Sequence, residues 1–155
     1  MAVSRISAGL LLYRILAGQV QFLLAHPGGP FWKNKDAGAW TIPKGELEAN
    51  EEPLAAAQRE FEEELGFKPQ GKFIELTPVK QKGGKIVRAW AVQGDCEPDQ
   101  IRSNTFNLEW PPRSGKQQAF PEVDRAAFFA LEQAKEKINL GQLPLLHEAT
   151  KLISL

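Results

Sequence analysis

Three glutamates, Glu60, Glu63 and Glu64, are spaced so that a helix would bring their carboxylates together. Residues three and four positions apart lie on the same face of an α-helix, where like charges repel by roughly 0.2–0.5 kcal/mol for each close pair. A divalent cation would offset this repulsion, because Mg²⁺ and Mn²⁺ prefer oxygen ligands and share their sites with substrate phosphates. The spacing therefore indicates a candidate metal site.

The alternative for such a run of acids is a helix face that is simply exposed to water, which is the common outcome for charge runs. The periodicity predicts the helix in either case, since Leu54, Phe61 and Leu65 fall on one side, away from the acids. Asn50 is the expected N-cap and Gly66 the expected C-terminal stop, so the helix is predicted over 50–65.

The residues around this helix form a longer pattern of fixed spacings. It begins with Gly45, continues after five residues with Glu51, and after seven more reaches residues 59–67, which read REFEEELGF. This pattern resembles the Nudix box, G-x5-E-x7-R-E-U-x-E-E-x-G-U, at every fixed position, and residues 40–44 (WTIPK) resemble its usual lead-in. Such a match arises by chance in roughly one chain in a million of this length. The resemblance outweighs the solvated-face alternative.

The resemblance implies a role for each residue of the box. Glu63 and Glu64 become ligands of Mg²⁺ or Mn²⁺, Glu60 a further ligand or the general base, and the backbone carbonyl near Gly45 another ligand. Arg59 would hold the glutamates in place. A cation shared with substrate phosphates withdraws charge from the phosphorus, while a carboxylate orients or deprotonates the attacking water. The implied reaction is hydrolysis without a covalent enzyme intermediate.

Other glutamates compete for places in or beside this site. Glu51 is expected to support the loop by capping or by a salt bridge rather than to bind metal. Many Nudix enzymes add a glutamate from a late loop, and residues 121–129 resemble that segment, which makes Glu122 a candidate ligand. Glu109 competes for this role, because it ends a predicted strand and could project toward the same cleft. The choice between Glu122 and Glu109 stays open.

Two loops hold residues that suit a nucleotide. Cationic side chains contact phosphate oxygens and exposed aromatic rings stack on bases, although lone surface charges are usually only solvated and aromatic residues are usually in the core. The phosphate candidates are Lys33 and Lys44, with Lys35 beside them, and Arg113 and Lys116 in the later loop; the base-clamp candidates are Phe31 and Trp32, followed by Phe106, Trp110 and Phe120.

The remaining pattern predicts the elements that position these residues. Strands are expected at 3–13, 20–26, 72–80, 85–94 and 104–110, further helices near 130–138 and 144–153, and loops at 27–39 and 111–121. The first two strands form a predicted hairpin. The strands follow one another too closely for βαβ units, so the α/β fold should have a mixed β-sheet flanked by helices. This order resembles the Nudix α/β/α sandwich, as a single domain over 1–155.

Composition narrows the setting of this chemistry. The 19 basic and 19 acidic residues cancel, so no general nucleic-acid binding and no attraction to a membrane are expected. The single cysteine, Cys96, excludes an internal disulfide framework and thiolate-rich zinc sites. No segment reads as an export signal or a membrane span, and the cytoplasm is the expected location.

The expected function is metal-dependent cleavage of a pyrophosphate bond in a nucleoside diphosphate derivative. Residues 7–14 and the long loop before Trp40 resemble the diadenosine-polyphosphate hydrolases of the Nudix family. The alternatives are pyrophosphohydrolysis of a nucleoside triphosphate, of a nucleotide sugar or coenzyme, or of an RNA 5′ end. A noncatalytic nucleotide sensor is disfavoured, because the acidic positions of the box are all present. His26 and His147 are expected to be structural.

Overall fold

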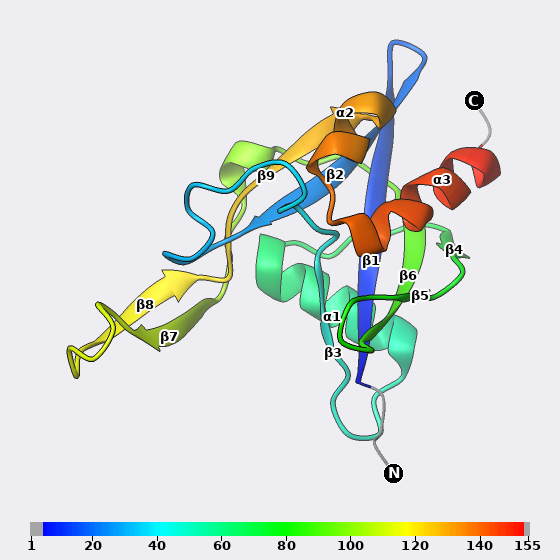
Figure 1. Ribbon diagram of the computed structural model, residues 1–155. Helices are drawn as coiled ribbons and strands as arrows, with labels where there is room; N and C mark the ends of the chain where they lie inside the picture. Colours follow the sequence, from blue (N-terminus) through cyan, green and yellow to red (C-terminus); the bar gives the residue numbers. More distant parts are fainter. Residues whose placement is uncertain (1–4, 154–155) are drawn as a thin grey trace.

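A seven-stranded mixed sheet forms the centre of the structure, a computed structural model that describes residues 5–153. Its main path runs β4-β6-β1-β2-β9, while β3 pairs with β1 and β5 with β6 (Figure 1). The strands are β1 Ile6–Leu16, β2 Gln19–Pro27, β3 Lys44–Glu46, β4 Phe73–Glu75, β5 Val79–Lys80, β6 Ile86–Gln93 and β9 Val123–Ala130. The β1–β6 pair is parallel and the other pairs are antiparallel. The predicted mixed sheet is confirmed.

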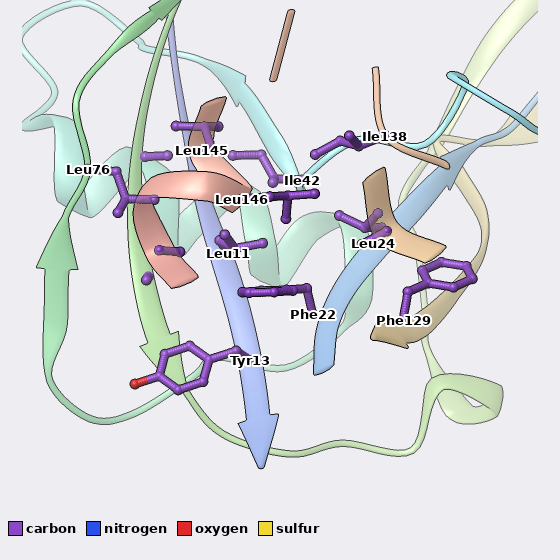
Figure 2. Close-up of a cluster of buried hydrophobic side chains, with 14 of the residues drawn as sticks. Leu11, Tyr13, Phe22, Leu24, Ile42, Leu76, Phe129, Ile138, Leu145 and Leu146 are labelled. Carbon is purple, nitrogen blue, oxygen red and sulfur yellow. The ribbon is translucent and has the colours of Figure 1, made fainter. Parts of the chain in front are cut away.

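Alternate side chains of β1 build a separate core on each face of this sheet. Leu10 and Leu12 pack with Phe61 of α1, whereas Leu11 points to the other face and packs with Leu146 of α3, as Figure 2 shows. Strand geometry, with its two-residue repeat, explains this division. The helices are α1 Pro53–Leu65, α2 Leu131–Lys137 and α3 Leu143–Leu152, with 3-10 turns η1 Pro98–Gln100 and η2 Leu140–Gln142. The result is the expected α/β/α sandwich; within residues 5–153, no helix is long and apolar enough to cross a membrane.

Helix α1 begins later than the sequence predicts. The expected N-cap, Asn50, has a φ of 62° and lies outside the helix, which starts at Pro53. Proline disfavours helical geometry in the residue before it, and Glu52 is accordingly extended, with φ −71° and ψ 133°. The predicted end is confirmed: Gly66 has a φ of 87° and donates its N–H to the Glu62 carbonyl over 2.8 Å.

The N-terminal hairpin is confirmed, with a tighter turn than predicted. Ala17 and Gly18 form the turn with φ values of 52° and 78°, the positive pair that suits a two-residue connection. The ladder therefore extends to the pair of Leu16 and Gln19. Residues 3 and 4, the start of the predicted first strand, lie outside the described residues.

The later strands differ more from their predictions. The expected strand 72–80 is split into the short β4 and β5, and the expected loop 111–121 contains a strand. That strand, β8 (Gln117–Pro121), pairs with β7 (Thr105–Glu109) in a separate two-stranded sheet, the β7–β8 hairpin, which projects from the body in Figure 1. Strand β8 is mostly exposed and lacks apolar alternation, so its sequence reads as a loop. Strands β3 and β9 were also not predicted, whereas both C-terminal helices are confirmed.

Candidate active site

Strand β3 packs so closely against α1 that a side chain at one of its positions would displace a glutamate of the helix. A Cβ atom on Gly45 would lie 2.0 Å from the Glu60 carboxyl carbon, and the β1–β3 ladder fixes the glycine by pairing it with Ala8. The absent side chain leaves the space that the carboxylate occupies. Gly45 and Glu60, fifteen positions apart in the sequence, thus meet at the start of the candidate site.

Arg59 gathers three glutamates on the same side of α1. Its Nε donates to Glu51 over 2.7 Å, while its Nη1 donates to Glu60 over 2.9 Å and to Glu63 over 3.1 Å. Nη2 also contacts the Glu46 carbonyl at 3.3 Å. The Arg59 guanidinium, with help from a backbone N–H, lowers the pKa of Glu51 to about 2. Glu51 precedes the helix and binds this arginine, which is the supporting geometry expected of it.

In a second group of acids, Glu60, Glu64 and Glu122, nearby cations neutralise the negative charge less completely. Burial, followed by the charge of Glu60, raises the pKa of Glu64 to about 8, against the lowering effect of Lys44. Burial likewise raises the pKa of Glu60, against the lowering effect of its arginine partner. Burial and then the charge of Glu63 raise the pKa of Glu122. The four acids therefore share a negative field, although they come from two distant parts of the chain.

This donor set fits a hard divalent cation in its chemistry. Carboxylates that raise one another's pKa are stabilised when a cation is added between them. In the present arrangement, no three His, Cys, Asp or Glu side chains within residues 5–153 converge closely enough to hold an ion. Arg59 contacts one carboxylate oxygen of Glu60 and both oxygens of Glu63, so it holds these two side chains close to one another.

A cleft of about 290 Å³ opens beside these acids. Glu64, Glu122, Lys44 and Trp32 line it, which brings four of the sequence-predicted residues together from separate segments. Burial, followed by the charge of Lys85, lowers the pKa of Lys44 to about 8. The cleft therefore combines acids, one readily deprotonated cation and one aromatic ring.

Several predicted site residues lie elsewhere. Glu109, Arg113 and Lys116 belong to the β7–β8 hairpin and its turn and do not line this cleft; the Glu109 carboxylate instead accepts the N–H of Arg113 over 2.8 Å. Of the two candidates for the late glutamate, only Glu122 lies in the cleft. Lys33 lines a different pocket, beside Trp110.

Phe31 and Trp32, two of the five aromatic candidates for stacking on a base, face different surroundings. Trp32 lines the cleft with Glu64, and the Lys35 ammonium lies 5.0 Å from the centre of its ring. Phe31 turns to the β7–β8 hairpin, where its ring meets Trp110 edge to face at a centroid distance of 5.5 Å. The two neighbours therefore cannot clamp one base between them in this conformation.

The structural role expected of His26 agrees with its contacts, but two polar residues of the cleft were not predicted from the sequence. Gln81 and Asn139 line the cleft, and the Gln81 Nε2 donates to the Asn139 Oδ1 over 3.4 Å. The two residues come from separate connections that carry no motif. Buried His26 connects the long loop to β9: its Nδ1 lies 2.8 Å from the Asp124 carboxylate and its Nε2 lies 2.6 Å from the Lys35 carbonyl. Its contacts identify His26 as the structural anchor of the loop that holds Trp32.

A larger cavity, of about 890 Å³, lies between β5 and α3 and has mainly apolar walls. Among its described lining residues the acid is Glu148, which already accepts hydrogen bonds from the backbone and hydroxyl of Thr77 over 2.6 and 2.8 Å. A cavity without converging acids is poorly suited to metal-assisted hydrolysis. The smaller cleft is the better candidate despite its size.

Comparison with known proteins identifies the sequence family. The model of the NUDIX domain matches residues 4–149. The chain is also similar to the bis(5′-nucleosyl)-tetraphosphatase [asymmetrical] of Caenorhabditis elegans, with 41% identity over 110 residues that cover 67% of this chain and 75% of the relative.

Solved structures share the fold. A crystal structure of C. elegans Ap4A hydrolase superposes with a TM-score of 0.63 and 22% identity, covering 97% of this chain and 98% of the other. The NUDIX domain of Shewanella oneidensis NrtR, crystallised with ADP ribose, has a TM-score of 0.69 and 13% identity, covering 99% and 91%. At these identities the likeness establishes the architecture, and function depends on the residues of the site.

Proposed function

Because this chain belongs to the NUDIX domain family and is a Nudix pyrophosphohydrolase, we propose that its substrate is a dinucleoside polyphosphate such as diadenosine tetraphosphate. The observation that carries the proposal is the cleft in which Glu64 and Glu122 lie beside Lys44 and Trp32. Acids for a metal, a cation for phosphate and a ring for a base are the three features that such a substrate requires. The similarity to a bis(5′-nucleosyl)-tetraphosphatase supports this choice.

The proposed cofactor is Mg²⁺ or Mn²⁺. The carboxylates of Glu60, Glu63, Glu64 and Glu122, with the backbone carbonyl of Gly45, would hold it. Bound there, the ion would draw charge from the phosphorus under attack and stabilise the leaving phosphate. The raised pKa values of Glu60, Glu64 and Glu122 support this assignment, because burial and then mutual repulsion disfavour their charged forms and a bound cation would stabilise those forms.

In the proposed reaction, Glu60 orients a water molecule and accepts one of its protons. The water oxygen forms a bond to phosphorus while the bond from phosphorus to the bridging oxygen breaks, and the electron pair leaves with the second phosphate. Lys44 contacts the phosphate oxygens, and Trp32 stacks on a base. Arg59, which bonds Glu60 and Glu63 directly, is a positioning residue. Asymmetrical cleavage, the mode named for the relative, would give a mononucleotide and a nucleoside triphosphate from diadenosine tetraphosphate.

The rival substrates are nucleoside triphosphates, nucleotide sugars and triphosphorylated RNA ends. All of them contain the same anhydride bond. ADP-ribose has additional support, because a structural neighbour was crystallised with it. A noncatalytic nucleotide-sensing role would leave binding without turnover. The single cysteine supports a reducing, cytoplasmic location as part of this proposal.

The test is a product-release panel in Mg²⁺ and in Mn²⁺. It compares diadenosine tetraphosphate, nucleoside triphosphates, ADP-ribose and triphosphorylated RNA, and chromatography identifies each product. We expect diadenosine tetraphosphate to have the highest kcat/KM and to give ATP and AMP. A higher kcat/KM for another substrate would overturn the assignment, and nucleotide binding without turnover would establish the sensing role.

A further inference from the structure

The β7–β8 hairpin is held to the body by the start of the long loop. A two-stranded hairpin is marginally stable alone, and the aromatic residues here provide the missing contacts. Phe31 meets Trp110 edge to face, and Gly29 lies against Phe106: a Cβ on this glycine, whose φ is 98°, would lie 3.0 Å from the end of that ring. The loop and hairpin therefore form one packed unit, in which Trp110 is fixed by Phe31.

A second pocket, of about 360 Å³, lies within this unit. Trp110, Phe120 and Pro30 give it flat apolar walls, while Gln118, Lys33 and Asp124 give it polar groups. An amide offers both a donor and an acceptor, and a carboxylate offers acceptors, so the edge of a heterocyclic base can be paired while its faces lie against the rings. This is the combination that recognises a nucleobase rather than an aliphatic ligand.

The second pocket and the cleft lined by Glu64 lie on opposite sides of the point where residues 27–30 contact residues 121–122. At this point, the Gly28 N–H donates to the Glu122 carbonyl over 2.9 Å. Pro27 and the Glu122 side chain line the cleft, whereas the adjoining Pro30 and Pro121 line the second pocket. A Cβ on Gly28 would lie 2.0 Å from the Pro121 carbonyl oxygen, so the two segments are in direct contact. The wall between the two sites is therefore one layer of backbone.

We propose that the second pocket is a nucleoside subsite, which takes the distal base of a dinucleoside polyphosphate while the bond to be cleaved lies in the Glu64 cleft. The inference rests on the proposed function and deepens it, because it explains how the enzyme selects two-base substrates. Trp32 is assigned to the base near the cleaved bond and Trp110 to the far base. Lys33, which lines the second pocket, contacts the phosphate that leads into it.

Binding of two matched analogues tests this subsite without turnover. They are methylene-bridged diadenosine tetraphosphate and methylene-bridged adenosine tetraphosphate, which carry the same phosphate chain with two bases or one. Calorimetric titration in Mg²⁺ measures their Kd for the wild type, Trp110→Ala and Trp110→Phe. We expect Trp110→Ala to raise the Kd of the two-base analogue about tenfold, as loss of one stacked base implies, and to leave the one-base Kd unchanged. Trp110→Phe should keep most of the affinity.

Leu16→Ala is the control, because Leu16 is an exposed apolar residue that lies at the distant β1–β2 turn. Equal changes in both Kd values for Trp110→Ala would mean that the hairpin only supports the cleft, and unchanged values would mean that no base binds there; either result overturns the subsite. The proposed function fails separately, when the wild type does not cleave diadenosine tetraphosphate. The binding ratio still decides the role of Trp110 in that case.

Discussion

The Glu60 carboxylate occupies the space that a side chain on Gly45 would fill, with 2.0 Å between the carboxyl carbon and the position of that Cβ. The obstacle is the far end of a flexible side chain rather than backbone. Glu60 can therefore swing away when the glycine is replaced, while the β1–β3 ladder keeps its register. This geometry separates the position of the proposed general base from the stability of the fold.

Gly45→Ala should accordingly reduce turnover much more than stability. We expect kcat to fall at least tenfold, because the displaced Glu60 no longer orients water, whereas the free energy of unfolding should change by roughly 1 kcal/mol or less. Steady-state kinetics and urea denaturation measure the two quantities. A large loss of stability would show that β3 itself had moved, and wild-type kcat would remove Glu60 from the proposed role.

Glu63→Gln should cut turnover by roughly a hundredfold or more while the fold stays intact, because an amide is a weaker ligand for a hard cation. Circular dichroism checks the fold and kcat measures the loss. Glu109→Gln is the matched control, since Glu109 lies on the β7–β8 hairpin outside the cleft. Full activity of the Glu63 variant would contradict the metal assignment.

Arg59→Lys should lower kcat/KM by roughly 10–100-fold, the usual effect of losing a residue that orients metal ligands. Lysine keeps the charge but cannot bond Glu51, Glu60 and Glu63 at once, as the guanidinium does. A metal titration of activity is the informative measurement, because poorly oriented ligands raise the Mg²⁺ concentration needed for half-maximal rate. An unchanged Mg²⁺ requirement would leave Arg59 with a purely structural role.

The stability of the metal-free protein should fall as pH rises from about 5 toward 8. Glu64 has a folded-state pKa of about 8, above its ordinary value of 4.5, so in this window the folded state retains a proton that the unfolded state has lost. Lys44 acts later: its folded pKa of about 8 lies below 10.5, so its contribution rises with pH between these two values. Denaturation in EDTA at pH 5 and 7.5 should show a smaller pH effect in Glu64→Gln. Parallel behaviour of the two proteins would contradict this account.

Trp32→Ala should mainly weaken nucleotide affinity. The ring lines the cleft beside Glu64 but neither transfers a proton in the proposed reaction nor binds the metal. The KM should therefore rise about tenfold while kcat stays nearly constant. Trp32→Phe should restore most of the affinity by keeping a stacking surface. An unchanged KM for the alanine variant would remove Trp32 from substrate binding.

Local patterns predicted the parts of the protein that local chemistry determines. The helix that carries Glu60 and Glu64, its end at Gly66 and the first hairpin could all be read from spacing and turn residues. The start of the helix was misplaced, because Asn50 has the composition of a cap but Pro53 decides where helical geometry begins.

Relationships between distant segments could not be read in this way. Strand β8 has no apolar alternation, and its partner β7 sets its conformation, so Gln117–Pro121 was predicted as loop. The sequence does not distinguish Trp32 from Phe31 as a base-stacking residue, yet Trp32 lines the cleft and Phe31 packs against Trp110. The choice of Glu122 over Glu109 likewise depends on which strand end reaches the cleft.

The contact between His26 and Asp124 spans 98 positions of the chain. During synthesis, the loop that follows His26 emerges long before β9, which must pair with β2 to bring Asp124 into place. Contacts of such long sequence separation form slowly, and incomplete chains expose unpaired strand edges meanwhile. A chain truncated before residue 123 would therefore have the complete acidic helix but a β2 edge open to aggregation. Competence for catalysis is therefore acquired only after β9 has been synthesised and has paired with β2.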